Sequence, residues 1–258
     1  MLPLTQGLDN HYSPAYTNRI ERWKTFLRKD PATSPTFQQT SLRTTVAFRF
    51  DKASCVVVGT FNMYILHPQW LIKNKFIDDP IEVGFETNLA RPGFRFRFEK
   101  AKIIWNVAPD RLTIETQDPQ VDCGKAIADI LRILPHTPLF ALGNNTHYQA
   151  DSSEFATLSQ PIRDFPRTES PTPDNKVVQR TFHVGVKRAE QETVNLQIAI
   201  KENSIELACN VHVDLVGRGT PSDSAIAAAE RFFDDRVESK LLAQHFFGTA
   251  IDHAPNSA

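Results

Sequence analysis

The chain has 258 residues, enough for one large domain or for two smaller domains that each bury a core. Its 29 Lys and Arg residues nearly balance its 30 Asp and Glu residues, so the net charge of -1 excludes a general attraction to nucleic acid or anionic membranes. Three cysteines, Cys55, Cys123 and Cys209, lie in apolar segments without a CxxC pair, which predicts reduced core thiols.

Several common kinds of site have no counterpart in the sequence. Phosphate-binding loops, dinucleotide glycine triads, HExxH helices and GxSxG elbows are missing. No apolar run approaches the roughly 18 residues of a membrane span, and no charged leader precedes an apolar stretch at the N-terminus. We therefore expect a cytoplasmic protein with no membrane association, no cofactor and no metal, in which catalysis is less favoured than binding.

Residues 1–44 are predicted to form an N-terminal arm with one short helix. Within the arm, Ile20, Trp23, Phe26 and Leu27 recur at helical spacing and form an apolar stripe. A helix of about 13 residues is marginally stable alone, so this stripe must pack on another surface. We expect these residues to contact a partner chain or a second copy of the protein.

Residues 45–150 are predicted to form a first α+β domain. Apolar alternation in 45–50 and an apolar run over 54–66 indicate strands, and 81–89, 93–107 and 111–117 carry further strand signals. An apolar stripe over 123–134 indicates a helix that Pro135 ends, and 138–148 reads as a final strand.

A proline-rich segment, 151–176, is predicted to link this domain to a second one at 177–250, with a tail at 251–258. Strict alternation in 194–200 and 204–216 is typical of strands with one apolar and one wet face. The fold class we predict is therefore α+β, with two antiparallel sheets, each covered by a long helix.

The long helix of the second domain is expected over 220–248. Thr220, Pro221 and Asp223 suit an N-terminal capping box, and Gly248 suits the C-terminal cap. The apolar stripe expected to cover the second sheet comprises Ile226, Ala229, Phe233, Val237, Leu241 and Leu242.

The segment Gly143-Asn144-Asn145-Thr146-His147-Tyr148 is the first candidate site. Alternation places Asn145 and His147 on one face of a strand and Asn144 and Tyr148 on the other, so they converge only if the strand bends at Gly143. His147 as a base or ligand is one interpretation. The favoured interpretation is a sheet strand whose amides satisfy neighbouring polar groups.

Asn210, His212 and Asp214 share one strand face and form the second candidate. Two ligands at i and i+2 on a strand can bind a metal, but a metal site needs a third and usually a fourth ligand, and the sequence offers only His183 as the third. An exposed polar sheet face, or a histidine hydrogen-bonded by Asp214, is the favoured interpretation.

A basic strip forms the third candidate, in which arginines alternate with phenylalanines. It comprises Arg91, Arg95, Arg97, Lys100 and Lys102. Such a strip suits a phosphate backbone, but alternation turns the phenylalanines to the opposite face, where they cannot stack on bases. A solvated strand face is therefore the favoured interpretation.

The layout of 45–250 resembles a sporadically distributed bacterial family of uncharacterised two-part α+β proteins. The resemblance rests on the segment from Leu134 to Pro138, the Gly143-Asn144 step, the strand from Val211 to Leu215 and a closing helix rich in phenylalanine. It implies a bacterial cytoplasmic protein encoded beside partners in a defence or conflict system, and it implies no activity.

The sequence supports three hypotheses for the function. The first is a noncatalytic protein-interaction subunit that uses the N-terminal helix or the polar sheet faces. The second is a nucleic-acid-binding accessory protein that uses the basic strip. The third is an enzyme of unknown reaction that depends on His147 or His212.

Overall fold

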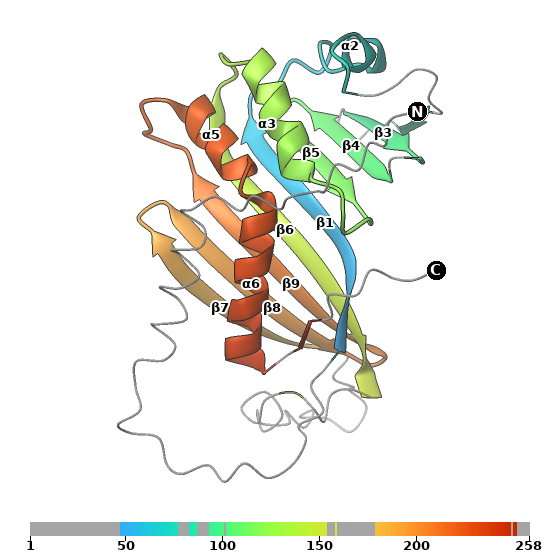
Figure 1. Ribbon diagram of the computed structural model, residues 1–258, viewed down its shortest axis with the longest axis vertical. Helices are drawn as coiled ribbons and strands as arrows, with labels where there is room; N and C mark the ends of the chain where they lie inside the picture. The colour runs from blue at the N-terminus through green and yellow to red at the C-terminus, as the bar shows by residue number, and fades with distance from the viewer. Residues whose placement is uncertain are drawn as a thin grey trace, which may run out of the picture. The chain divides into compact units, whose positions relative to one another are not determined.

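The structure, a computed structural model, describes residues 47–76, 83–86, 93–100, 102–153, 158, 179–248 and 250–251 (Figure 1). They belong to one compact unit, Thr44–Ala258. The strands are β1 (Ala47–Gly59), β2 (Val83–Glu86), β3 (Phe94–Phe98), β4 (Ile103–Ala108), β5 (Arg111–Thr116), β6 (Leu139–Asp151), β7 (Gln179–Ala189), β8 (Glu192–Lys201), β9 (Ser204–Asp214) and β10 (Ala250–Ile251). The helices are α2 (Pro68–Lys73), α3 (Cys123–Ile133), α5 (Pro221–Ala229) and α6 (Phe232–Phe247).

A single sheet runs through both halves of the chain, so the prediction of two sheets is wrong. The strand order is β2-β3-β4-β5-β1-β6-β9-β8-β7, with all neighbours antiparallel, and β10 adds a short parallel pair to β1. The halves join where β6 pairs with β9 over the full length of β9, from Ala141 opposite Asp214 to Asp151 opposite Ser204. Alternation in sequence reveals the two faces of a strand but not its edge partners, which is why the junction was missed.

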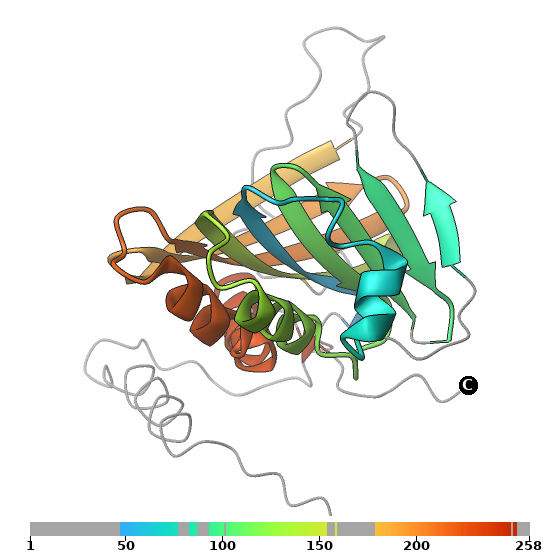
Figure 2. The same ribbon diagram turned by 90° about the horizontal axis from the view of Figure 1, so that it is seen from above.

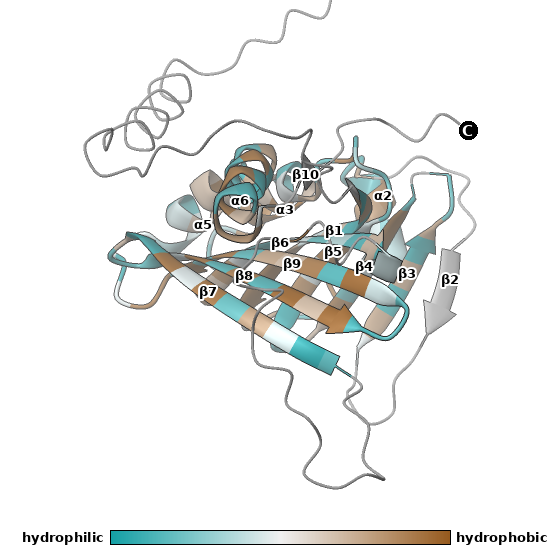
Figure 3. Ribbon diagram, turned by 90° about the horizontal axis from the view of Figure 1, so that it is seen from below, coloured by the Kyte–Doolittle hydropathy of each residue, from teal (hydrophilic) through white to brown (hydrophobic). Residues whose placement is uncertain are grey.

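The helices all lie on one side of the sheet (Figure 2). We call this side the helix face and the other side the open face. Within the described residues no helix is both long and apolar enough to cross a membrane. The fold is therefore α+β with two layers, and the open face is a sheet surface that none of these helices covers (Figure 3).

The core fills the space between the sheet and the helices. Its largest fully buried members include Trp105, Phe96, Phe232, Ile127 and Leu131. All three cysteines are buried and unpaired, as the sequence predicts, and burial raises the pKa of the Cys123 and Cys209 thiols to about 12.

Helix α3 packs so closely on α5 that glycine is required at the contact. A Cβ at Gly124 would lie 2.0 Å from the carbonyl oxygen of Ala229, which no real side chain tolerates. Asp122 caps α3 by accepting a hydrogen bond from the Lys125 amide at 2.8 Å. This end of α3 is therefore fixed both by its cap and by its neighbour.

The expected long helix is interrupted between α5 and α6 at Glu230 and Arg231. Thr220 stands at the N-cap of α5 without a side-chain cap bond, so the predicted capping box does not form. Gly248 does end α6 in the left-handed conformation, with φ at 68°, as predicted.

The break also changes the buried face of α6. The buried positions are Phe232, Asp235, Ser239, Leu242, Ala243 and Phe247. Leu241 is expected to be buried as part of the apolar stripe of one continuous helix, but this residue is 41 % exposed. One of the buried side chains, Asp235, is a carboxylate, and its partners lie on the helix face.

Those partners form a buried ionic network centred on Arg188 of β7. The Arg188 guanidinium donates hydrogen bonds to Asp235 at 2.7 Å, to Glu238 at 2.9 Å and to Glu192 at 2.9 Å. The side chains of Arg188 and Asp235 are only 4 % and 1 % exposed. Burial alone would raise the pKa of Glu192, but the Arg231 and Arg188 guanidiniums outweigh it and hold that pKa below its usual value.

We predict that Arg188→Met lowers the free energy of unfolding by about 3–5 kcal/mol, because Asp235 would stay buried without its cation. Arg132→Met is the matched control, since Arg132 pairs with Asp129 and Glu230 at the surface and its loss should cost about 0–1 kcal/mol. Urea unfolding at neutral pH measures both. Equal losses in the two variants would contradict a central role for the network.

A second prediction concerns the junction of the halves. If a protease site is inserted within 159–178 and cut, the two fragments should still elute together and melt in one transition, because β6 and β9 remain paired. Size-exclusion chromatography and calorimetry of the cut protein test this. Two separately folded fragments would instead support the two-domain division predicted from the sequence.

Candidate functional site

Four side chains on the open face form a continuous hydrogen-bonded chain across four strands. We call Ser54, Asn145, Asn210 and Asn195 the amide row; they are cross-strand neighbours on β1, β6, β9 and β8. Asn195 Nδ2 donates to Asn210 Oδ1 at 3.2 Å, and Asn210 Nδ2 donates to Asn145 Oδ1 at 2.7 Å. Asn145 Nδ2 donates to Ser54 Oγ at 3.3 Å, which completes the chain.

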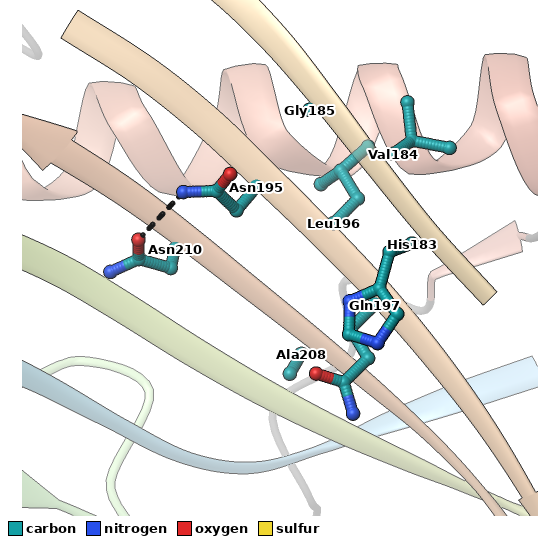
Figure 4. A pocket seen from close by; sticks show the side chains of 8 residues that line it. All are labelled: His183, Val184, Gly185, Asn195, Leu196, Gln197, Ala208 and Asn210. Carbon is teal, nitrogen blue, oxygen red and sulfur yellow. Dashed lines mark hydrogen bonds between the residues drawn. The ribbon is translucent and has the colours of Figure 1, made fainter. Parts of the chain in front are cut away.

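The amide row stops at the edge strand β7, where Gly185 is the cross-strand neighbour of Asn195. Here the open face has a hollow of about 130 Å³ (Figure 4). Gly185 and Ala208 supply almost no side chain, while Asn195, Gln197 and His183 stand around them. The hollow therefore offers amide and imidazole hydrogen-bonding groups beside a glycine that leaves space.

His147 lies one row further along the open face and is half-buried. Its cross-strand neighbours are Lys52 on β1 and Ala208 on β9. Burial lowers the pKa of the imidazole, and the positive charge of Lys52 lowers it further. The neutral imidazole is therefore favoured, which suits hydrogen bonding more than a role as a cation.

The adjacent residues Asn144 and Tyr148 lie on the helix face, as alternation predicts. Asn144 is buried and its Nδ2 donates to Asp235 at 2.8 Å and to the Ala228 carbonyl at 3.1 Å. Tyr148 is also buried, and the Lys240 ammonium lies 5.6 Å from the centre of its ring. The Gly143–Tyr148 segment does not converge on one site, because its two sets of side chains enter different layers.

The second candidate of the sequence does not assemble into a metal site. His212 and His183 share the open face, but His183 lies on β7 in the row of Ala208, which is four residues along and two strands across from His212, or about 16 Å away. Asp214 Oδ1 accepts from the Val216 amide at 2.9 Å, so it caps the following turn. Within the described residues no group of three His, Cys, Asp or Glu side chains is placed to hold a metal ion.

The basic strip is split by the structure. Arg95 and Arg97 lie on the open face opposite the buried Phe96 and Phe98, as predicted. Lys100 and Lys102 lie in or beside the turn before β4, where Lys102 pairs with Asp118 at 3.3 Å. Arg91 and the N-terminal stripe of Ile20, Trp23, Phe26 and Leu27 lie outside the described residues.

Sequence reasoning did not single out Ser54, Asn195, Gln197 or Gly185 as site residues. The signal was present in part, because alternation in 194–200 already turned Asn195 and Gln197 away from the core. What was missing is the strand order, which alone makes them neighbours of Asn145 and Asn210.

No family model matches the chain, and none of the curated proteins is significantly similar to it.

We predict a pH-dependent contribution of His147 to stability. Because the folded state lowers the pKa of His147 below 6.5, the unfolded chain binds a proton more readily. The associated stability is complete above pH 6.5 and is lost as the pH falls from there toward the folded-state pKa. The stability advantage of the native protein over His147→Gln should therefore shrink between pH 7.5 and pH 5.5.

Urea unfolding at constant ionic strength measures this difference. The same substitution at His212, which is exposed, provides the matched control. A difference between native protein and His147→Gln that does not change with pH would contradict the prediction.

Proposed function

We propose that the protein is a noncatalytic interaction subunit that binds another protein chain through the open face. The observation that carries this proposal is the amide row, a set of hydrogen-bonded side chains held in fixed orientations on a sheet surface that the described helices leave uncovered. Side chains already ordered in this way lose little conformational entropy on binding.

The charge of the open face supports a protein partner. Its acidic groups are interspersed with basic ones, and Lys52 pairs with Glu115 at 3.9 Å while Lys201 pairs with Glu206 at 2.5 Å. A surface of paired charges and neutral amides suits a polar, water-containing protein interface. It gives little long-range attraction to a polyanion.

Nucleic acid is the second candidate, and one observation favours it. Arg97 stands at the far end of the same cross-strand row as the amides, linked through Ile104 and Glu115 to Ser54. The phenylalanines of β3 face the core, however, so this strand offers no base-stacking platform on the open face.

An enzymatic role has less support. His147 and His212 share the open face with the amide row, but no hydrogen bond within the described residues joins either imidazole to a hydroxyl or thiol. Membership of a bacterial defence or conflict system remains a prediction of the resemblance alone.

The experiment places a negative charge on each layer. His212→Glu and Thr113→Glu change the open face, and Lys125→Glu changes the exposed surface of α3. Tagged full-length proteins are isolated from the native host, with and without nuclease, and the proteins bound are quantified by mass spectrometry. All three variants should melt at the temperature of the native protein.

We expect a protein partner that binds the native protein and Lys125→Glu but is lost at least tenfold with both open-face variants. Nuclease treatment should not release it. Equal recovery by all variants, or loss with Lys125→Glu alone, would contradict the proposal. Nuclease-sensitive binding that weakens steeply with salt would favour the nucleic-acid alternative.

A further inference from the structure

The edge strand β7 pairs with β8 on one side, and no strand in the described residues pairs with its other side. It is eleven residues long, so one whole edge of backbone donors and acceptors faces away from the sheet. Natural proteins usually protect such edges with charged residues, proline or bulges, or they cover them.

Among the described residues, the sequence features that protect an edge stand only at the ends of β7. Lys187 and a register shift between Lys187 and Ala189 stand at one end, and Arg180 stands at the other. The six central residues, Thr181 to Val186, contain no charge and no proline. The centre of the edge is therefore suited to pairing with another strand.

We propose that the protein forms a two-fold symmetric dimer in which β7 pairs antiparallel with β7 of a second copy, with the axis at Val184. The two sheets then become one continuous sheet, and the two open faces lie side by side on the same surface. This interface lies at the β7 edge of the open face, and its proposal does not rest on the partner binding proposed above.

The pairing is self-complementary on the open face. With the axis at Val184, His183 of each copy stands opposite Gly185 of the other. Each imidazole therefore lies opposite a residue without a side chain, and symmetry repeats this contact on both sides of the axis. The hollow of about 130 Å³ at Gly185 has room for the imidazole. No side-chain donor in the described residues reaches Asn195 Oδ1, which lies 3.7 Å from the position of a Cβ at Gly185.

The distances allow His183 of the partner subunit to donate to Asn195 Oδ1. The two residues would stand two strands apart, about 9.6 Å between backbones. An imidazole and an amide reaching toward each other, with one hydrogen bond between them, span about that distance. The amide row would thus continue from one copy into the other.

The helix face is complementary in the same register. Phe182 stands opposite Val186 of the partner subunit, and Val184 stands opposite its own copy, so half-buried apolar side chains meet. The only like-charge pair is Arg180 with Arg188, and Arg188 is already neutralised by Asp235, Glu238 and Glu192.

Neighbouring registers that preserve the two faces fit less well. An axis at His183 sets two imidazoles against each other, and an axis at Gly185 leaves the hollow empty and sets Lys187 against His183. Of these registers, only the axis at Val184 sets an imidazole against Gly185 in both copies.

The first test measures mass by light scattering on the full-length protein. The native protein should be a dimer, and Val184→Asp should be a monomer, because two carboxylates would meet at the axis. Circular dichroism checks that the variant is folded. His183→Ala, which removes both proposed hydrogen bonds, should raise the dimer dissociation constant by about 30-fold.

The second test uses a substitution that should not disturb folding. The native thiols are buried, so an introduced cysteine reacts selectively. Val184→Cys should form a disulfide-linked dimer under mild oxidation, because its partner lies directly across the axis. Thr181→Cys is the matched control and should not, since two copies of residue 181 would lie about 20 Å apart.

A monomeric native protein would overturn the proposal, as would a dimer that persists in Val184→Asp or one that crosslinks equally well through both cysteines. Loss of the dimer in Val184→Asp with retained capture of the open-face partner would show that the two surfaces act separately.

Discussion

The arrangement of the two layers depends on the hydrogen bonds that link Asn144, Asp235 and Arg188. Asn144 lies on β6, Asp235 on α6 and Arg188 on β7, so one buried polar network joins three elements that are distant in sequence. A buried carboxylate is tolerated only where its partners are correctly placed, so the network allows few positions for α6. The break between α5 and α6 is consistent with this demand, because it turns Asp235 and Ser239 toward the sheet.

Asn144 and Asn145 are neighbours in sequence but serve opposite layers. Asn144 forms hydrogen bonds to the helices, whereas Asn145 forms hydrogen bonds at the centre of the amide row. Two adjacent residues of β6 therefore serve the helix layer and the face proposed for binding. A substitution at Asn144 therefore tests packing, and one at Asn145 tests the surface.

Several features followed from the sequence because they depend on local periodicity. The two faces of β3, β6 and β9, the burial of the cysteines and the glycine cap at Gly248 all follow from alternation, apolar context or backbone freedom. The single sheet, the broken helix and the amide row did not follow, because each depends on contacts between distant residues. No local pattern in β7 marks Arg188 as the partner of Asp235, since an arginine at that position reads as an exposed edge residue.

The amide row also has a direction. Every amide nitrogen in it points toward β1 and every amide oxygen points toward β7, so the small dipoles of the three asparagines add head to tail. In such a chain each bond polarises the next. The carbonyl of Asn195 is therefore a stronger acceptor than an isolated amide, and the Ser54 hydroxyl at the other end is a stronger donor. A row of uncharged side chains thus has a negative end toward β7 and a positive end at β1, and a substitution at Ser54 would change the acceptor strength of Asn195, three strands away.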